Sequence, residues 1–134
     1  MNEKNAKIYQ SFGPRIGKFK ISEKLIEEIN VHIDTLSKKK KLSPELDMGN
    51  NLVGQVTQEI KLSEEFVAKR LMNELANITK IFISNAIKKE ITKFHLIESW
   101  VVRQFENEYN PIHWHGGHIS GVAYLKYPEE VSKE

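Results

Sequence analysis

From Lys93 the hydrophobic period of this chain changes to two, and that change sets the main constraint on its fold. Up to Phe82 the apolar residues recur at helical spacing in two long stretches. From Lys93 to Phe105 they alternate with a period of two and fall on both sides of an extended chain. Helical segments followed by strands predict an α+β fold whose β-rich part lies toward the C-terminal end.

Both helical stretches begin after a serine that is suited to cap a helix. Ser22 precedes the first, which runs into a lysine run, and Ser63 precedes the second, which has two glutamates in its first turn. The expected buried faces are Leu25, Ile26, Ile29, Ile33 and Leu36 in the first helix, and Phe66, Val67, Leu71, Leu75, Ile78 and Phe82 in the second.

Four other segments are expected to be extended. The first, residues 8–21, alternates loosely and is broken by turn residues at Gly13-Pro14 and Gly17. Residues 52–62 alternate as a strand, and residues 42–51 before them resemble a loop. The strand at 93–105 and a last strand from Ile119 to Tyr127 flank a turn and a histidine-rich segment.

Composition restricts the class of protein. The 134 residues fit one domain covering 1–134, and the absence of cysteine excludes a disulfide framework and any thiolate site. No secretory signal or stretch of about 18 apolar residues is present, so we expect a cytoplasmic location and no membrane span. Net charge is only +2. The run Lys38–Lys41 could contact phosphates, but a solvated helix end explains it more simply, and nothing else points to nucleic acid.

Three of the five histidines fall within six residues. His113 and His115 are two apart, so an extended backbone projects both imidazoles from one face, where they can share an ion. Neutral imidazole suits Fe, Zn, Cu and Ni, so the pair does not select the metal. His118 would face away in a regular strand, although the preceding glycines could redirect it. The alternative is two partly buried histidines hydrogen-bonded to backbone or water, with Trp114 packed on the other face.

The residues around the pair carry a family resemblance. The run Asn-Pro-Ile-His-Trp-His, a Gly-containing turn, and Ile-Ser-Gly-Val-Ala-Tyr-Leu-Lys-Tyr-Pro, ending at Pro128, resembles the metal-binding region of iron(II)/2-oxoglutarate oxygenases from a branch common in marine phages and bacteria. Ser99-Trp-Val-Val-Arg-Gln-Phe105 is similar to the first strand of the same jelly roll. The N-terminal half is similar to the helical support of that branch, less distinctively.

The resemblance implies a site and an activity. It implies helices packed on the first strands of a double-stranded β-helix, Fe(II) and 2-oxoglutarate as cofactors, and hydroxylation of a substrate carbon. His113 matches the first metal ligand, and His115 stands where the family has a carboxylate. Arg103 and Tyr124 are the expected cofactor contacts, although Tyr124 also reads as core. Trp100 and Phe105 are expected to wall the pocket.

The resemblance also predicts that the site is incomplete. The family's distal histidine and its cosubstrate-binding basic residue belong on later strands, and no histidine follows His118. We therefore expect a fragment of a longer jelly roll, with little or no turnover by the 134-residue chain. The alternative is a non-catalytic binding or structural module with vestigial histidines. In a third arrangement, a second copy covers an open sheet edge and completes the site.

Overall fold

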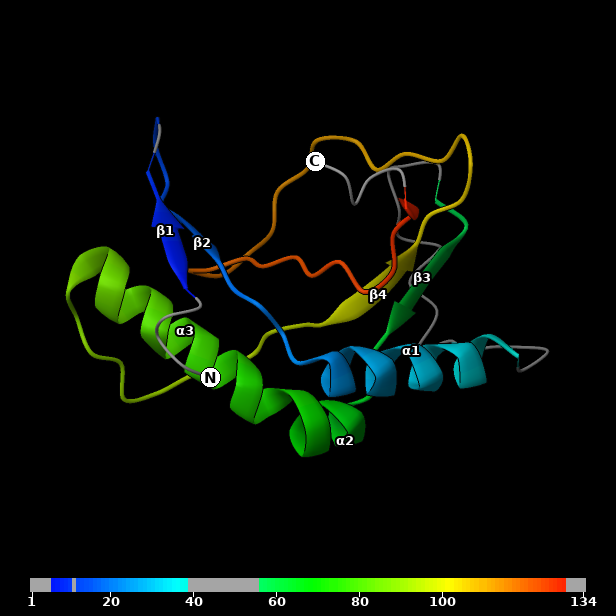
Figure 1. Cartoon of the computed structure of the whole chain (residues 1–134), viewed down its shortest axis with the longest axis horizontal. Coiled ribbons are helices and arrows are strands. Elements are labelled where there is room, and N and C mark those ends of the chain that lie inside the picture. Colours follow the sequence, from blue (N-terminus) through cyan, green and yellow to red (C-terminus); the bar gives the residue numbers. More distant parts are fainter. Residues whose placement is uncertain (1–5, 11, 39–55, 130–134) are drawn as a thin grey trace. The chain divides into compact units, whose positions relative to one another are not determined.

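The computed structural model describes residues 6–10, 12–38 and 56–129. It has an α+β fold with two long helical segments and two small antiparallel sheets, which confirms the expected α+β class (Figure 1). The β-rich part expected toward the C-terminal end is wrong for the described residues, because one sheet lies within residues 7–18 and the last strand ends at Arg103. The chain divides into two compact units, one of Met1–Leu25 with Leu62–Ser99 and one of Ile26–Lys61 with Trp100–Glu134. Most of the lysine run, the loop expected at 42–51 and the first residues of the strand expected at 52–62 lie outside the described residues.

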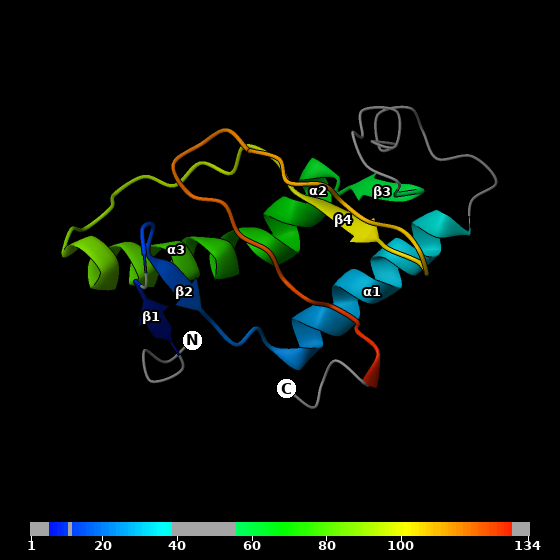
Figure 2. The same cartoon turned by 90° about the horizontal axis from the view of Figure 1, so that it is seen from above.

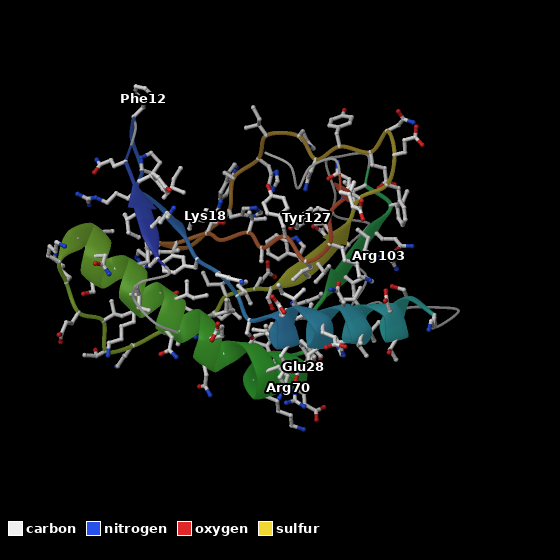
Figure 3. All side chains as sticks on the ribbon, in the orientation of Figure 1. Phe12, Lys18, Glu28, Arg70, Arg103 and Tyr127 are labelled. Atoms are coloured by element: carbon white, nitrogen blue, oxygen red, sulfur yellow. The ribbon has the colours of Figure 1, made fainter. Side chains whose placement is uncertain are left out.

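The first unit contains a small hairpin and a long helix. Strands β1 (Lys7–Tyr9) and β2 (Ile16–Lys18) pair antiparallel, with Ile8 opposite Gly17. The expected extended segment is therefore a hairpin, and Phe12 projects fully exposed near its tip (Figure 3). A Cβ at Gly17 would lie 2.6 Å from a ring carbon of Phe19 and 2.7 Å from one of Phe82, so the backbone of β2 can approach these rings closely only with glycine there.

The helix after Ser63 begins where the sequence predicts. The Ser63 hydroxyl accepts a hydrogen bond from the backbone N–H of Phe66 at 3.3 Å, as an N-cap does. The helix comprises α2 (Glu64–Phe66), a π-helical segment η3 (Val67–Leu71) and α3 (Met72–Ile87). Val67 and Leu71 are buried and the other predicted face residues are half-buried, which confirms the orientation expected from the apolar stripe.

The second unit holds the sheet nearest the histidines. Helix α1 (Glu23–Ser37) buries its stripe at Ile29, Ile33 and Leu36. Strands β3 (Gln58–Lys61) and β4 (Trp100–Arg103) pair antiparallel and lie side by side in Figure 2.

The register of this sheet sorts the side chains by face. Glu59 lies opposite Val102, and Lys61 lies opposite Trp100. Because side chains alternate along a strand, these four residues share one face, and Ile60 and Arg103 share the other.

Two strand predictions need correction. Residues 93–99 form no strand, so the strand expected from Lys93 to Phe105 is confined to β4, and His95 is exposed rather than covered. Residues 119–127 form no strand either. A strand needs a neighbouring backbone to pair with, and alternation alone does not supply one.

The C-terminal segment is instead held by side chains of α1. The amide of Asn30 donates to the carbonyl of Leu125 at 3.4 Å, and Lys126 forms an ion pair with Asp34 at 3.4 Å. Since these contacts engage the outer side of one helix, they fix the course of the segment without giving it a regular ladder. Among the described residues, no helix is both long and apolar enough to cross a membrane.

Candidate metal-binding histidine pair

The imidazoles of His113 and His115 meet edge to face. Their Nε2 atoms are 2.9 Å apart, and the ring centroids are 4.5 Å apart at an interplanar angle of 89°. The Nδ1 of His113 lies 2.7 Å from the carbonyl oxygen of Pro111. A carbonyl can only accept, so Nδ1 of His113 carries a proton, and the 2.9 Å contact between the two Nε2 atoms is a hydrogen bond in which one nitrogen donates and the other accepts.

A backbone without regular strand structure brings the rings together. Residues 110–119 are in neither strand nor helix, and Gly117 adopts φ 98°, a conformation that favours glycine and turns the chain just after the pair. Both histidines are exposed, and Trp114 between them is 87% exposed. The burial of the histidines and the packing of Trp114 expected in the alternative are therefore wrong, whereas its hydrogen bond to backbone is present at His113.

The spacing of the two nitrogens fits a shared ion. With metal–nitrogen bonds of about 2.0–2.1 Å, two imidazole nitrogens at octahedral or tetrahedral angles lie roughly 2.9–3.4 Å apart. The observed 2.9 Å matches the octahedral end of that range. A histidine ligand commonly donates its other ring N–H to a carbonyl, as His113 does to Pro111. Within residues 6–10, 12–38 and 56–129, no group of three or more acidic, histidine or cysteine side chains is placed to hold a metal.

The sheet face beneath the pair contributes two more side chains. The ring of Trp100 lies 5.2 Å from that of His115, centroid to centroid. The Trp100 side chain also hydrogen-bonds Glu59 on β3, where the indole N–H donates to the carboxylate. Glu59 is 7% exposed. Burial raises the pKa of this carboxyl above its ordinary value, while the nearby imidazole of His113, the Trp100 hydrogen bond and His115 lower the pKa to a smaller extent.

The two expected cofactor residues, Arg103 and Tyr124, are not held on this face by a contact with the histidine pair. Arg103 lies on β4 (Figure 3), on the opposite side of the sheet from Trp100, and its guanidinium carbon is 5.8 Å from the centre of the Phe105 ring. Tyr124 is 76% exposed, so it is not the core residue that its alternation suggested. The cofactor roles of both residues stay predictions. Phe105 is half exposed, and Trp100 lies beside the pair.

The remaining three histidines are His118, His95 and His32. His118 is exposed on the turn that contains Gly117, and no contact joins its ring to the pair. His95 is exposed in the first unit, and His32 is half-buried on α1 beside the apolar stripe, as expected.

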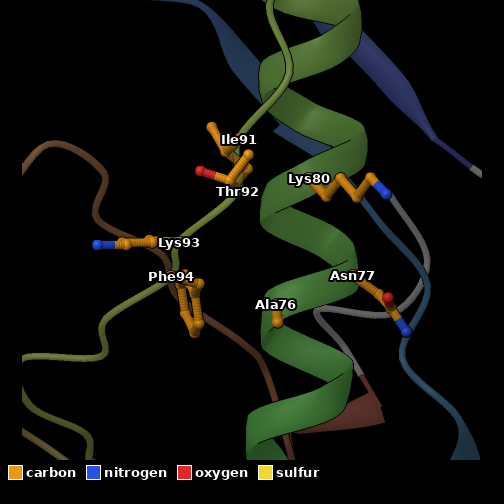
Figure 4. A pocket seen from close by; sticks show the side chains of 7 residues that line it. All are labelled: Ala76, Asn77, Lys80, Ile91, Thr92, Lys93 and Phe94. Atoms are coloured by element: carbon orange, nitrogen blue, oxygen red, sulfur yellow. The ribbon is translucent and has the colours of Figure 1, made fainter.

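One pocket of about 160 Å³ lies in the first unit, between α3 and residues 91–94. Figure 4 shows that the amines of Lys80 and Lys93 point in opposite directions, away from one another. Since no polar groups converge in it, the pocket has the shape of a surface hollow rather than of a site for a specific ligand.

Comparison with protein-family models, curated proteins and solved structures finds no match for this chain. The histidine pair and its surroundings therefore carry the functional argument by themselves.

Sequence reasoning missed Glu59. The alternation of residues 52–62 placed it on a polar face, about fifty positions before the histidines, like any other glutamate of this charged chain. Its burial and its hydrogen bond to Trp100 arise from the pairing of β3 with β4, which no local pattern encodes.

Proposed function

We propose that His113 and His115 bind a divalent metal ion in a mononuclear centre of the iron(II)/2-oxoglutarate oxygenase type. The observation that carries this proposal is the convergence of the two Nε2 atoms at 2.9 Å, with Nδ1 of His113 donating to Pro111. That arrangement fixes one ring by a backbone contact and brings both Nε2 atoms to one region of space, where a metal ion would replace the proton shared between them.

The sequence resemblance implies the identity of the metal and of the cosubstrate. Iron(II) with 2-oxoglutarate would supply oxygen activation for hydroxylation of a substrate carbon. His113 and His115 would hold the ion, the Pro111 carbonyl would keep the tautomer of His113, and Trp100 would cover one face of His115. Arg103 and Tyr124 are assigned to the cosubstrate by the same resemblance.

The finer features of the fold and the location belong to this proposal as well. A jelly roll is implied by the resemblance, and its support in the structure is the antiparallel pair β3–β4. A cytoplasmic location agrees with the chain's lack of cysteine and would keep iron in the divalent state, since that compartment is reducing.

Titration of the 134-residue protein with Co(II), followed by calorimetry and by visible absorption, tests the metal site. Co(II) replaces Fe(II) because it does not oxidise readily in air and takes the same imidazole ligands. We expect one ion per chain and a loss of affinity of more than about tenfold in His113→Ala and in His115→Ala.

Two further variants locate the ligands. His95→Ala removes an exposed imidazole of the first unit and should leave Co(II) affinity unchanged. His118→Ala distinguishes a two-histidine site, which it should not affect, from one that recruits the third histidine. Equal affinity in the wild type and in both pair variants would show that the assignment is wrong.

Conversion of 2-oxoglutarate to succinate separates an active enzyme from a protein that only binds the metal. An intact oxygenase centre with Fe(II) should form succinate even without its substrate, whereas the incomplete site expected of this chain should form little or none. A binding or structural module with vestigial histidines should neither bind the metal nor form succinate. The assay uses His113→Ala as the blank for succinate formed without the site.

A further inference from the structure

Glu59 is the one charged residue that is buried among those that the structure describes. The adjacent Ile60 is 1% exposed, so both faces of β3 are covered at this point. Removing an ionised carboxylate from water costs several kcal/mol, so a buried carboxylate is usually paired with a cation or has a functional role. The partners around Glu59 are therefore informative.

Those partners lead directly to the histidine pair. Glu59 and Trp100 share one face of the β3–β4 sheet, and the indole N–H of Trp100 holds the carboxylate. The same indole lies against His115, whose Nε2 faces that of His113. The carboxylate also lies within electrostatic range of both imidazoles. Strand β3, strand β4 and the histidine segment thus contribute to one continuous cluster.

A divalent cation held by two neutral imidazoles alone would keep its full charge. A carboxylate near such an ion stabilises it, and the attraction is stronger where the carboxylate is shielded from water. The histidine segment supplies no carboxylate of its own between Asn110 and Gly121.

We infer that Glu59 is the charge-balancing carboxylate of the histidine site. It acts from the sheet beneath the pair, held in place by the Trp100 indole, and selects a divalent cation over an anion or a neutral ligand. Glu59 is a positioning residue in this role, since it acts on the ion through charge and through the hydrogen-bonded Trp100 that packs on His115. The inference rests on the proposed metal-binding function and adds a residue from a distant part of the sequence.

The test measures Co(II) affinity in Glu59→Gln, which keeps a hydrogen-bond acceptor for Trp100 and removes the charge. We expect affinity to fall by about tenfold or more, as for other residues that support metal ligands. The matched control is Glu106→Gln, an exposed glutamate on the turn after β4 that makes the same change in net charge. It should leave the affinity within about twofold of wild type, because exposed charges are screened by salt.

Two further variants separate charge from packing. Glu59→Asp keeps the carboxylate and should bind Co(II) more tightly than Glu59→Gln. Trp100→Phe keeps a ring against His115 and removes the donor that holds the carboxylate, so affinity should fall, but less than in Glu59→Gln. Should Glu59→Gln fail to fold, Trp100→Phe decides the matter, since Glu59→Asp keeps the charge.

The outcomes distinguish this inference from the proposal beneath it. If wild type binds no Co(II), or if the histidine variants bind it normally, the metal-binding function itself fails. If wild type binds through the histidines while Glu59→Gln matches it within twofold, the role of Glu59 is overturned and the histidine site stands. When Glu59→Gln does not fold, unchanged affinity in Trp100→Phe overturns the role of Glu59 in the same way, and the histidine site stands.

Discussion

In the second unit, Glu59, His113 and His115 form an electrostatic cluster, and a bound cation and burial affect these side chains differently. His113 and His115 are exposed and gain from a bound cation, whereas Glu59 is buried and loses hydration when it ionises. Without metal, the cluster should therefore lower the free energy of unfolding, and a bound metal ion should restore it. This trade-off gives a prediction at Glu59 that does not depend on catalysis.

Glu59→Gln should stabilise the metal-free protein at neutral pH. Burial raises the folded-state pKa of Glu59 above 4.5, so the contribution of this carboxyl to stability is fully present below the unfolded pKa. It is lost as the pH rises through the raised folded pKa. The glutamine variant should gain on the order of 1 kcal/mol at pH 7 and nothing at pH 4. Urea unfolding at both pH values in the presence of a chelator measures this, and a variant less stable than wild type at pH 7 would contradict it.

Glu108 should produce the opposite pH dependence. The Thr57 hydroxyl donates to its carboxylate at 2.6 Å and the Phe105 N–H donates at 2.9 Å, and these bonds lower its pKa. A lowered folded pKa gives stability that is present above the ordinary value of 4.5 and is lost as the pH falls through the folded pKa.

Thermal unfolding of Glu108→Gln between pH 3 and 7 checks this expectation. The variant should have a lower melting temperature at pH 6 and a flatter decline in acid than wild type. The exposed Glu106→Gln is the control, since it should follow the wild-type curve. Parallel acid limbs in all three proteins would exclude a role for Glu108.

At the scale of elements, a helix cap and a close packing contact determine the local structure of the first unit. The helix at 64–87 begins at the Ser63 cap, and the β1–β2 hairpin approaches α3 where Gly17 leaves room for the Phe82 ring. Each feature involves one replaceable atom or hydrogen bond, so single substitutions can test it.

Gly17→Ala should destabilise the protein by about 1–3 kcal/mol, because its methyl group would overlap the rings of Phe19 and Phe82. Gly13→Ala is the matched control. A Cβ at Gly13 meets no atom within 4 Å, so this variant should match or slightly exceed wild type. Chemical denaturation of both proteins measures the difference, and equal stability would mean that the hairpin does not pack on α3 as described.

Ser63→Ala should cost about 1 kcal/mol, since the Phe66 N–H would lose its acceptor. Ser63→Asp should restore most of the loss, because a carboxylate can cap the same N–H and also suits the positive end of the helix. Far-ultraviolet circular dichroism during thermal unfolding compares the three proteins. A normal melting temperature in the alanine variant would argue against the cap.

For the whole molecule, the buried residues divide between the two units, and each unit has a small core. Ile60 on β3 is the most completely buried large side chain of the described residues, and β3 belongs to the unit that holds the histidine pair. Small cores make the folded state sensitive to single cavities. Stability and metal binding are thus linked through the same strand.

Ile60→Ala should lower the free energy of unfolding by about 2–5 kcal/mol, through lost burial and a cavity. Ile97→Ala removes a side chain that is 64% exposed and should change stability by no more than about 0.5 kcal/mol. Co(II) bound to the folded state should raise the stability of both wild type and Ile60→Ala by mass action. No protection by Co(II) in either protein would contradict metal binding by the folded state.

Local pattern in the sequence by itself determined the helices, their caps and their buried stripes. Periodicity placed Ile29 and Ile33 inside, and the spacing of His113 and His115 identified the residues whose rings meet. Both depend on neighbours a few positions apart, which the sequence states directly. Tertiary structure decided where β3 finds β4, so alternation at 119–127 without a partner produced no strand. It also buried Glu59 under a histidine pair about fifty residues away, since that depends on pairing between segments that local chemistry does not specify.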